Sequence, residues 1–248
     1  MLIGNTLLSA GSYKSFTVRD TNSSGTLRVT IDLTTETLGQ TSWTCTTGQV
    51  VTVNRAVGTG YPTAIVDRST LRFDGSNDQL RQPITLNTGT FNGTSGSLSV
   101  IVALRHTAGL GNFDTLWSAE TGAGGGPRLF LNSSNASTLG AAVSGGGVFD
   151  QLLIPNAVPT DGSVVMVGIS CANGTANAYS SALDTLSANI TYTNIPTMTF
   201  ASNATCGIMP DGPNPYFGEI LATAVWQGKA LTLAEFRTAA LHLTGPYV

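Results

Sequence analysis

Short bursts of alternating apolar and polar residues constrain the fold of this 248-residue chain more than any other feature. Alternation with a period of two gives a strand one apolar face, and the Gly, Asn, Ser and Pro clusters between the bursts supply turns for steric reasons. Bursts at intervals of roughly 8 to 12 residues are typical of a sandwich or a barrel. Strands are expected at residues 15–19, 26–33, 97–105, 128–132, 163–170 and 218–226.

One helix is expected near the end of the chain. Thr232 can cap its first turn, and Glu235, three residues later, can reach back to the cap as in a capping box. Gly245–Pro246 is suited to end the helix. The apolar residues between these signals recur at helical spacing and form one stripe, Leu233, Phe236, Ala240 and Leu243. We expect this helix to cover one edge of the sandwich.

The low charge of the chain limits its partners. Charged residues make up 10% of the sequence, against about 25% in ordinary soluble proteins. The net charge is −3 and only Lys14 and Lys229 are lysines, so no basic stripe is present for a nucleic acid. A neutral surface loses the self-repulsion that keeps monomers apart. This favours assembly with copies of the chain, although a merely Thr-rich β-protein fits the composition as well.

Cysteine usage and hydropathy indicate a soluble protein made in the cytosol. Cys45, Cys171 and Cys206 are odd in number and form no Cys-x-x-Cys pair, which argues against zinc and against a disulfide framework. We expect them to be small buried groups. The first residues lack a basic region and a long apolar run, so no secretory leader is expected. No stretch approaches the roughly 18 apolar residues of a membrane span, so no membrane insertion is expected.

The first 60 residues differ from the rest of the chain. They are richer in Thr and poorer in long apolar bursts, and the segment 58–62, "GTGYP", is suited to a hinge. Residues 1–60 are therefore predicted to form an N-terminal β arm or small subdomain that could anchor the chain to a particle. They could equally supply the first strands of the sandwich.

Three segments resemble a known family. "YPTAIVDRSTLRFDGSNDQL" followed by "GSLSVIVALRH", and "YFGEILATAVWQGKALTLAEFRTAALHL" near the end, resemble the opening and closing elements of concanavalin A-like (laminin G-like) jelly-roll domains. The "FDGSND" turn and the closing element are similar to those of bacteriophage virion proteins and bacterial surface proteins. Over residues 61–248 the resemblance implies an all-β, two-sheet antiparallel jelly-roll sandwich with one short C-terminal helix. It leaves function open, because this fold hosts lectins, glycanases and structural modules.

The polar segment "DGSND" at residues 74–78 admits three interpretations. Asp74, Asn77 and Asp78 could converge on calcium, but that ion takes six to eight oxygen ligands and one turn supplies about half of them. The same residues suit a structural turn in which Asp74 and Asn77 bond turn amides and Gly75 takes a positive φ. A third interpretation is half of an active site. We favour the structural turn and expect no metal or other cofactor, with calcium as the alternative.

No catalytic arrangement is recognisable. Sugar hydrolysis needs two carboxylates beside the scissile bond, and the resemblance implies that a glycanase of this fold would carry them as Glu-x-Asp-x-x-Glu on one strand. The four glutamates, Glu36, Glu120, Glu219 and Glu235, have no such neighbourhood. His106, after a strand, is interpreted as a polar residue at a strand end rather than a base. We therefore expect a protein that is not an enzyme.

Glycan binding would need an aromatic platform with amide and carboxylate groups around it. Trp117 and Trp226 lie in strand patterns and are predicted to be core residues, and Trp43 is a further aromatic candidate. Tyr216, in the loop "PDGPNPYFG", is predicted to be exposed and to be the platform. The polar candidates near an aromatic residue in sequence are Asn112, Asp114 and Asp211.

These observations favour a structural protein displayed on the surface of a bacteriophage virion, as a head decoration, fibre or tail appendage. Its expected partners are other virion proteins, copies of itself and a host surface glycan. A free-standing carbohydrate-binding module is the next interpretation, and a degenerate glycoside hydrolase the third.

Overall fold

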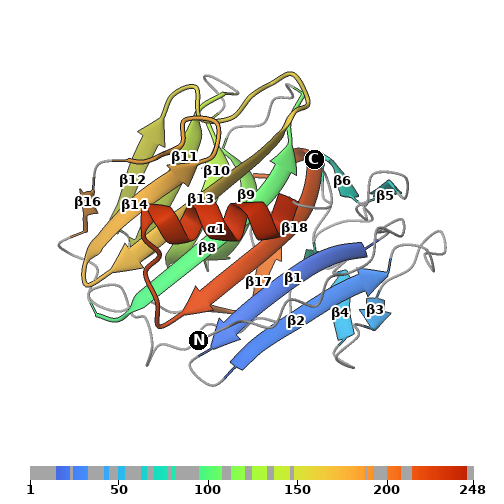
Figure 1. Ribbon diagram of the computed structural model, residues 1–248, viewed down its shortest axis with the longest axis horizontal. Coiled ribbons are helices and arrows are strands. Elements are labelled where there is room, and N and C mark those ends of the chain that lie inside the picture. The colour runs from blue at the N-terminus through green and yellow to red at the C-terminus, as the bar shows by residue number, and fades with distance from the viewer. Residues whose placement is uncertain are drawn as a thin grey trace.

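The computed structural model describes two stacked β-sheets and one helix (Figure 1). It describes residues 15–22, 25–32, 42–44, 50–53, 63–65, 70–76, 80–81, 95–107, 113–120, 125–132, 137–145, 148–187, 189–192, 200–207 and 214–244. For the strands before Arg72, the structure describes the backbone pairing but not the side chains. The all-β, two-sheet antiparallel sandwich with one C-terminal helix is thereby confirmed, with a single parallel pair, β1 and β18, among the described pairings.

The first sheet follows the order β15-β14-β13-β8-β18-β1-β2, with β16 beside β14 and β6 and β5 beside β18. β18 is long enough to carry two neighbours on one side, since Phe217–Ile220 pair with β6 and Ala222–Trp226 pair with β1. Its described strands are β1 (Ser15–Asn22), β2 (Gly25–Asp32), β5 (Thr63–Ile65), β6 (Thr70–Asp74), β8 (Ser97–Arg105), β13 (Val164–Ala172), β14 (Thr175–Ser180), β15 (Thr185–Leu186), β16 (Ile190–Thr191) and β18 (Phe217–Gln227).

The second sheet follows the order β12-β11-β10-β9-β17-β7-β4-β3. β9 to β12 are successive antiparallel neighbours, as expected for strands joined by short turns. Its described strands are β3 (Ser42–Thr44), β4 (Val50–Val53), β7 (Leu80–Arg81), β9 (Asp114–Glu120), β10 (Gly126–Leu131), β11 (Leu139–Gly145), β12 (Val148–Ile154) and β17 (Phe200–Cys206).

The core between the sheets comes from alternate residues of each strand. In β8 the side chains of Leu98, Val100, Val102 and Leu104 enter this core. Trp117, predicted to be a core residue, is fully buried there. Cys171 and Cys206 are also buried, as predicted, and burial raises the pKa of the Cys171 thiol to about 12.

The helix α1 (Leu233–Thr244) lies across the outer face of the first sheet, over its central strands β8 and β13 (Figure 1). The expectation that it covers an edge is therefore wrong. The physical reason is that β8 is apolar on both faces, so Ile101 and Ala103 need a second cover and receive it from Phe236 and Ala240 of the helix. Trp226 is half-buried at the margin of the same cluster.

The predicted capping box is confirmed. Glu235 Oε2 accepts a hydrogen bond from the Thr232 amide at 2.9 Å, and Thr232 Oγ1 accepts one from the Glu235 amide at 3.4 Å. Leu243, Gly245 and Pro246 of the predicted stripe and stop lie outside the residues whose side chains are described. Across the described part of the chain, no helix is long and apolar enough to cross a membrane.

Strands that precede residue 61 continue both sheets. β1 pairs with β18 in the first sheet, and β4 pairs with β7 in the second. Two predictions about residues 1–60 stay predictions: that they form a separate N-terminal unit ending at Gly60, and that they anchor the chain to a particle.

Candidate functional site

A row of charged side chains crosses three strands at one end of the first sheet. Glu219 of β18 stands opposite Arg72 of β6 on one side and opposite Arg105 of β8 on the other. Directly opposed residues of antiparallel strands point to the same face. The next pair along the strands, Ile220 and Leu104, enters the core between the sheets. The three charged residues therefore occupy the outer face, which farther along the strands is covered by α1.

The two arginines of this row are not equivalent. Arg72 Nη2 lies 2.8 Å from Glu219 Oε1, and the Glu219 side chain is only 7% exposed, against 51% for Arg72. The Arg105 guanidinium makes no hydrogen bond or ion pair with any described residue, and its Nε is buried. Two guanidinium groups and one carboxylate leave the row with a net charge of about +1 at neutral pH.

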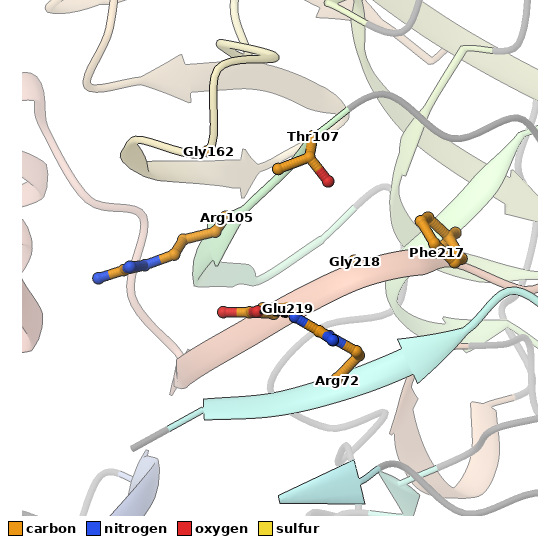
Figure 2. Close-up of a pocket in the computed structure, with 7 residues that line it drawn as sticks. All are labelled: Arg72, Arg105, Thr107, Gly162, Phe217, Gly218 and Glu219. Carbon is orange, nitrogen blue, oxygen red and sulfur yellow. Dashed lines mark hydrogen bonds and ion pairs between the residues drawn. The ribbon is translucent and has the colours of Figure 1, made fainter. Parts of the chain in front are cut away.

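These residues line a pocket of about 270 Å³, which we call the strand-end pocket; its lining is Arg72, Arg105, Thr107, Gly162, Phe217, Gly218 and Glu219. In Figure 2 the Glu219 carboxylate lies between the two guanidinium groups, and Phe217 lies at the end of the pocket away from the Arg105 guanidinium. The Phe217 side chain is large and 43% exposed. The pocket volume of about 270 Å³ lies just below the roughly 300–1,000 Å³ range of small-molecule sites.

Two backbone features hold the rim of the strand-end pocket. The Gly162 amide donates to the His106 carbonyl at 3.1 Å, which fastens the loop before β13 to the end of β8. Gly162 has φ +80°, and a Cβ there would meet Thr107 Cγ2 at 3.2 Å. Glycine is favoured at this contact, because other residues are strained at this φ and a Cβ would require Thr107 to shift by a few tenths of an ångström.

The polar segment at residues 74–76 supports the pocket from the side of β6. The Asp74 carboxylate accepts the Ser76 amide at 2.8 Å, and Gly75 has φ +76°, so this part of the segment is a turn. A Cβ on Gly75 would meet Phe217 Cβ at 3.1 Å. The turn therefore packs against Phe217 and helps to place its ring.

The calcium interpretation of residues 74–78 stays a prediction. Asn77 and Asp78 lie outside the described residues. Within the described ranges, no group of three or more His, Cys, Asp or Glu side chains is placed to hold a metal ion.

Tyr216, predicted to be an exposed platform, is fully buried, so that prediction is wrong. Its amide bonds the Gly207 carbonyl at 2.6 Å and thereby ties the end of the Pro-rich loop to the end of β17. The tyrosine ring consequently turns into the core against Phe73 and His106. Burial raises the pKa of its hydroxyl well above the ordinary value, and the charges of Asp114 and Glu219 act in the same direction.

Tyr216 nevertheless contacts the backbone of a residue that lines the pocket. Its hydroxyl donates to the Arg105 carbonyl at 3.0 Å. Gly218 makes this contact possible, because a Cβ at that position would lie 2.2 Å from the Tyr216 hydroxyl oxygen. The backbone of Arg105 is thus held by a buried tyrosine.

Among the other predicted glycan-binding residues, Asp114 is described and its charge acts on Tyr216. Asp114 is 2% exposed and is the first residue of β9, so it is buried rather than available at the surface. Asn112 and Asp211 lie outside the described residues, and Trp43 is described only through the backbone of β3. The described geometry therefore gives no site built on these predicted residues.

Arg72, Arg105, Phe217 and Glu219 were not predicted as site residues. The signal that could have identified them is the alternation of "YFGEI" at residues 216–220. If Ile220 faces the core, Gly218 and Tyr216 face it too, whereas Glu219 and Phe217 face outward. The predicted aromatic residue, Tyr216, is thus the neighbour in sequence of the aromatic residue that lines the pocket, Phe217.

A more deeply buried ion pair lies in the other sheet. Arg128 Nη1 lies 3.6 Å from Glu120 Oε2, Ser144 Oγ donates to Glu120 Oε1 at 2.7 Å, and the Arg128 guanidinium lies 4.8 Å from the centre of the Phe130 ring. Glu120 and Glu219 are thus each bound to an arginine, on different sheets.

In the strand-end pocket, Glu219 is the sole carboxylate among the described lining residues, which does not match the paired carboxylates of a glycosidase.

A shallower hollow of about 420 Å³ lies between α1 and the strands β13 and β14. Arg237 of the helix and Asp184 form an ion pair at its margin, with 2.7 Å between Nε and Oδ1. This pair is exposed, and it lowers the pKa of the Asp184 carboxyl chiefly through the Arg237 hydrogen bond.

No protein-family model matches the chain, and no curated protein sequence matches it. Solved structures do. The binding domain of botulinum neurotoxin serotype D superposes with a TM-score of 0.56 at 11% identity, over 79% of this chain and 48% of that one. The CBM40 of Ruminococcus gnavus IT-sialidase gives 0.51 at 14% identity, over 68% and 95%. The native heptameric SAP-like pentraxin of Limulus polyphemus gives 0.52 at 15% identity, over 69% and 81%.

These likenesses establish a concanavalin A-like jelly-roll fold. Identities of 11–15% carry the fold alone, because jelly rolls host many unrelated functions. The chain spans about half the length of the toxin binding domain that it matches.

Proposed function

We propose that this chain is a non-enzymatic jelly-roll module of a bacteriophage virion surface, and that it contributes to attachment by binding a host glycan in the strand-end pocket. One observation carries the binding part. An exposed aromatic ring, a hydroxyl group and three charged side chains line one small pocket at the end of the sheet. Sugars need this combination, because their C–H faces stack on aromatic rings while their hydroxyl groups require directional partners.

The distribution of groups around the pocket suits a sugar. Phe217 offers a ring face that is 43% exposed. Thr107 can donate and accept, and the carboxylate of Glu219 is of the acceptor type that sugar hydroxyl groups need. With a volume of about 270 Å³, the pocket suits one sugar residue with the rest of a glycan outside it.

The solved neighbours support a binding role without defining it. The CBM40 structure has also been solved bound to α2,3 sialyllactose, and a botulinum neurotoxin DC binding domain has been solved in complex with rat synaptotagmin II. Both are binding domains on the same fold. The absence of a second carboxylate among the described residues of the pocket is in keeping with binding rather than hydrolysis.

The virion setting rests on other observations. The "FDGSND" turn and the closing element resemble those of virion proteins, and the depleted charge favours close packing with further copies. The runner-up, a free-standing carbohydrate-binding module, is favoured by the CBM40 likeness, which covers 95% of that module. Size-exclusion chromatography with light scattering separates the two. A trimer or larger assembly supports virion display, whereas a monomer that binds sugar supports the runner-up.

Glycan-array binding of the wild type and of Phe217→Ala tests the binding part. We expect the wild type to bind a subset of glycans and Phe217→Ala to lose most of that signal. Phe113→Ala is the matched control, because Phe113 is 36% exposed and contacts Phe130 of the other sheet. Loss of signal in both variants, or no signal from the wild type, would remove the proposed glycan site.

A further inference from the structure

We infer that the strand-end pocket selects acidic sugars, with Arg105 as the direct partner of the sugar's carboxylate or sulfate group. This inference rests on the proposed glycan binding and names the class of glycan. It starts from the charge balance of the row that crosses β6, β18 and β8. The charge of Arg72 is balanced by Glu219 in an ion pair. Arg105 therefore contributes the net positive charge of the pocket lining.

The bonding state of Arg105 is the second step. Its Nε is buried, and none of the described residues accepts a hydrogen bond from its guanidinium. A buried donor without an acceptor is unfavourable by about 1–3 kcal/mol. Arg105 also lines the pocket, and a guanidinium binds an anion better than a neutral hydroxyl group because charge-assisted hydrogen bonds are roughly twice as strong.

The position of Arg105 is the third step. The Tyr216 hydroxyl holds its carbonyl, and the loop at Gly162 is fastened to the neighbouring His106 carbonyl. Arg105 is also registered between β18 and β13 within the sheet, opposite Glu219 and Val164. The base of this side chain is therefore fixed before a ligand arrives, which reduces the entropy lost on binding.

The remaining lining residues orient the sugar around its acidic group. In Figure 2 Phe217 lies at the end of the pocket away from the Arg105 guanidinium, and Thr107 lies above the line between them. A sugar whose acidic group meets Arg105 can place its ring toward Phe217. Glu219, a carboxylate beside Arg105, disfavours a second anionic group at the same place and favours ligands that carry one acidic group.

The Arg105 Nε–Hε signal provides a direct readout. In ¹⁵N-labelled full-length protein, glucuronic acid and glucose 6-sulfate are titrated separately, with glucose as the neutral counterpart of both. We expect the Arg105 signal, assigned by its loss in Arg105→Gln, to shift with one or both acidic sugars and not with glucose. A shift with glucuronic acid alone identifies a carboxylate site, and a shift with glucose 6-sulfate alone identifies a sulfate site.

Three variants complete the experiment. Arg105→Gln should weaken binding of the acidic sugar roughly tenfold or more, and Arg105→Lys should lie between it and the wild type because an ammonium lacks the fork. Arg237→Gln removes the same charge from the exposed pair with Asp184 and should bind like the wild type. Equal loss in Arg105→Gln and Arg237→Gln would reduce the effect to net charge and overturn the inference.

The outcomes separate this inference from the proposed function. Glucose and the acidic sugars binding equally well, with no effect of Arg105→Gln, would overturn the acidic selectivity and leave glycan binding standing. Absence of binding to any of the three sugars and to the glycan array would overturn both.

Discussion

Replacing Tyr216 by Phe tests whether a buried hydroxyl organises the strand-end pocket. The substitution keeps the ring and removes one oxygen, which lies 3.0 Å from the Arg105 carbonyl in a fully buried environment. Loss of one such partner destabilises a protein by about 1–3 kcal/mol. In a chain of this size, each kcal/mol lowers Tm by roughly 2–4 °C. We expect a fall in Tm of about 2–12 °C together with weaker glycan binding.

Urea unfolding and glycan binding of the same preparations provide the two measurements. Tyr192→Phe is the matched control, because its hydroxyl donates to the Thr175 carbonyl at 3.2 Å and its side chain is likewise buried, but it lies outside the lining of the pocket. It should lower stability by a similar amount and leave binding unchanged. If Tyr216→Phe is as stable as the wild type, or if both variants lose binding equally, the positioning role of Tyr216 is refuted.

Four further predictions concern stability. Gly218→Ala should cost about 2–4 kcal/mol in urea unfolding, because its Cβ would lie 2.2 Å from the Tyr216 hydroxyl oxygen. Burial lowers the pKa of His106 from 6.5, so below about pH 6.5 the unfolded chain binds more protons than the folded chain. The free energy of unfolding should therefore decrease as the pH is lowered, by at most about 1.4 kcal/mol per pH unit. His106→Gln should flatten that part of the pH profile. Thr232→Ala should cost about 1 kcal/mol through the lost cap, measured by the same unfolding assay. Asp74→Ala should lower Tm because the Ser76 amide loses its acceptor, and EDTA should leave the wild-type Tm unchanged; a comparable fall with EDTA would favour calcium.

The fold was predictable because its signals are local. The predicted bursts at residues 97–105 and 218–226 correspond to the strands Ser97–Arg105 and Phe217–Gln227. The capping box at Thr232 likewise depends on residues three apart. The position of α1 was not predictable in the same way, because it depends on which face of β8 lacks a cover, and "SLSVIVALR" is apolar on both faces.

The candidate site was less predictable, because it depends on registers between distant strands. Arg72 and Glu219 are 147 residues apart in the sequence and are joined by a hydrogen bond across β6 and β18. No local pattern indicates that pairing. The error at Tyr216 has a different cause, since a Pro-rich loop is ordinarily exposed, whereas the backbone bond to Gly207 draws this loop end into the core.

The polar turn and the pocket form one arrangement. The Asp74 turn lies opposite Phe217 in the register of β6 and β18, and Gly75 allows the backbone to approach the phenylalanine side chain to van der Waals contact. One residue farther, Gly218 leaves space for the Tyr216 hydroxyl, and one residue beyond that, Glu219 binds Arg72. Successive residues of a strand point to opposite faces, so along "YFGE" the Tyr216 side chain supports the pocket from the core while the Phe217 and Glu219 side chains line it, and Gly218 belongs to the lining through its backbone. The alternation of the strand itself therefore supplies both the support and the lining of the strand-end pocket.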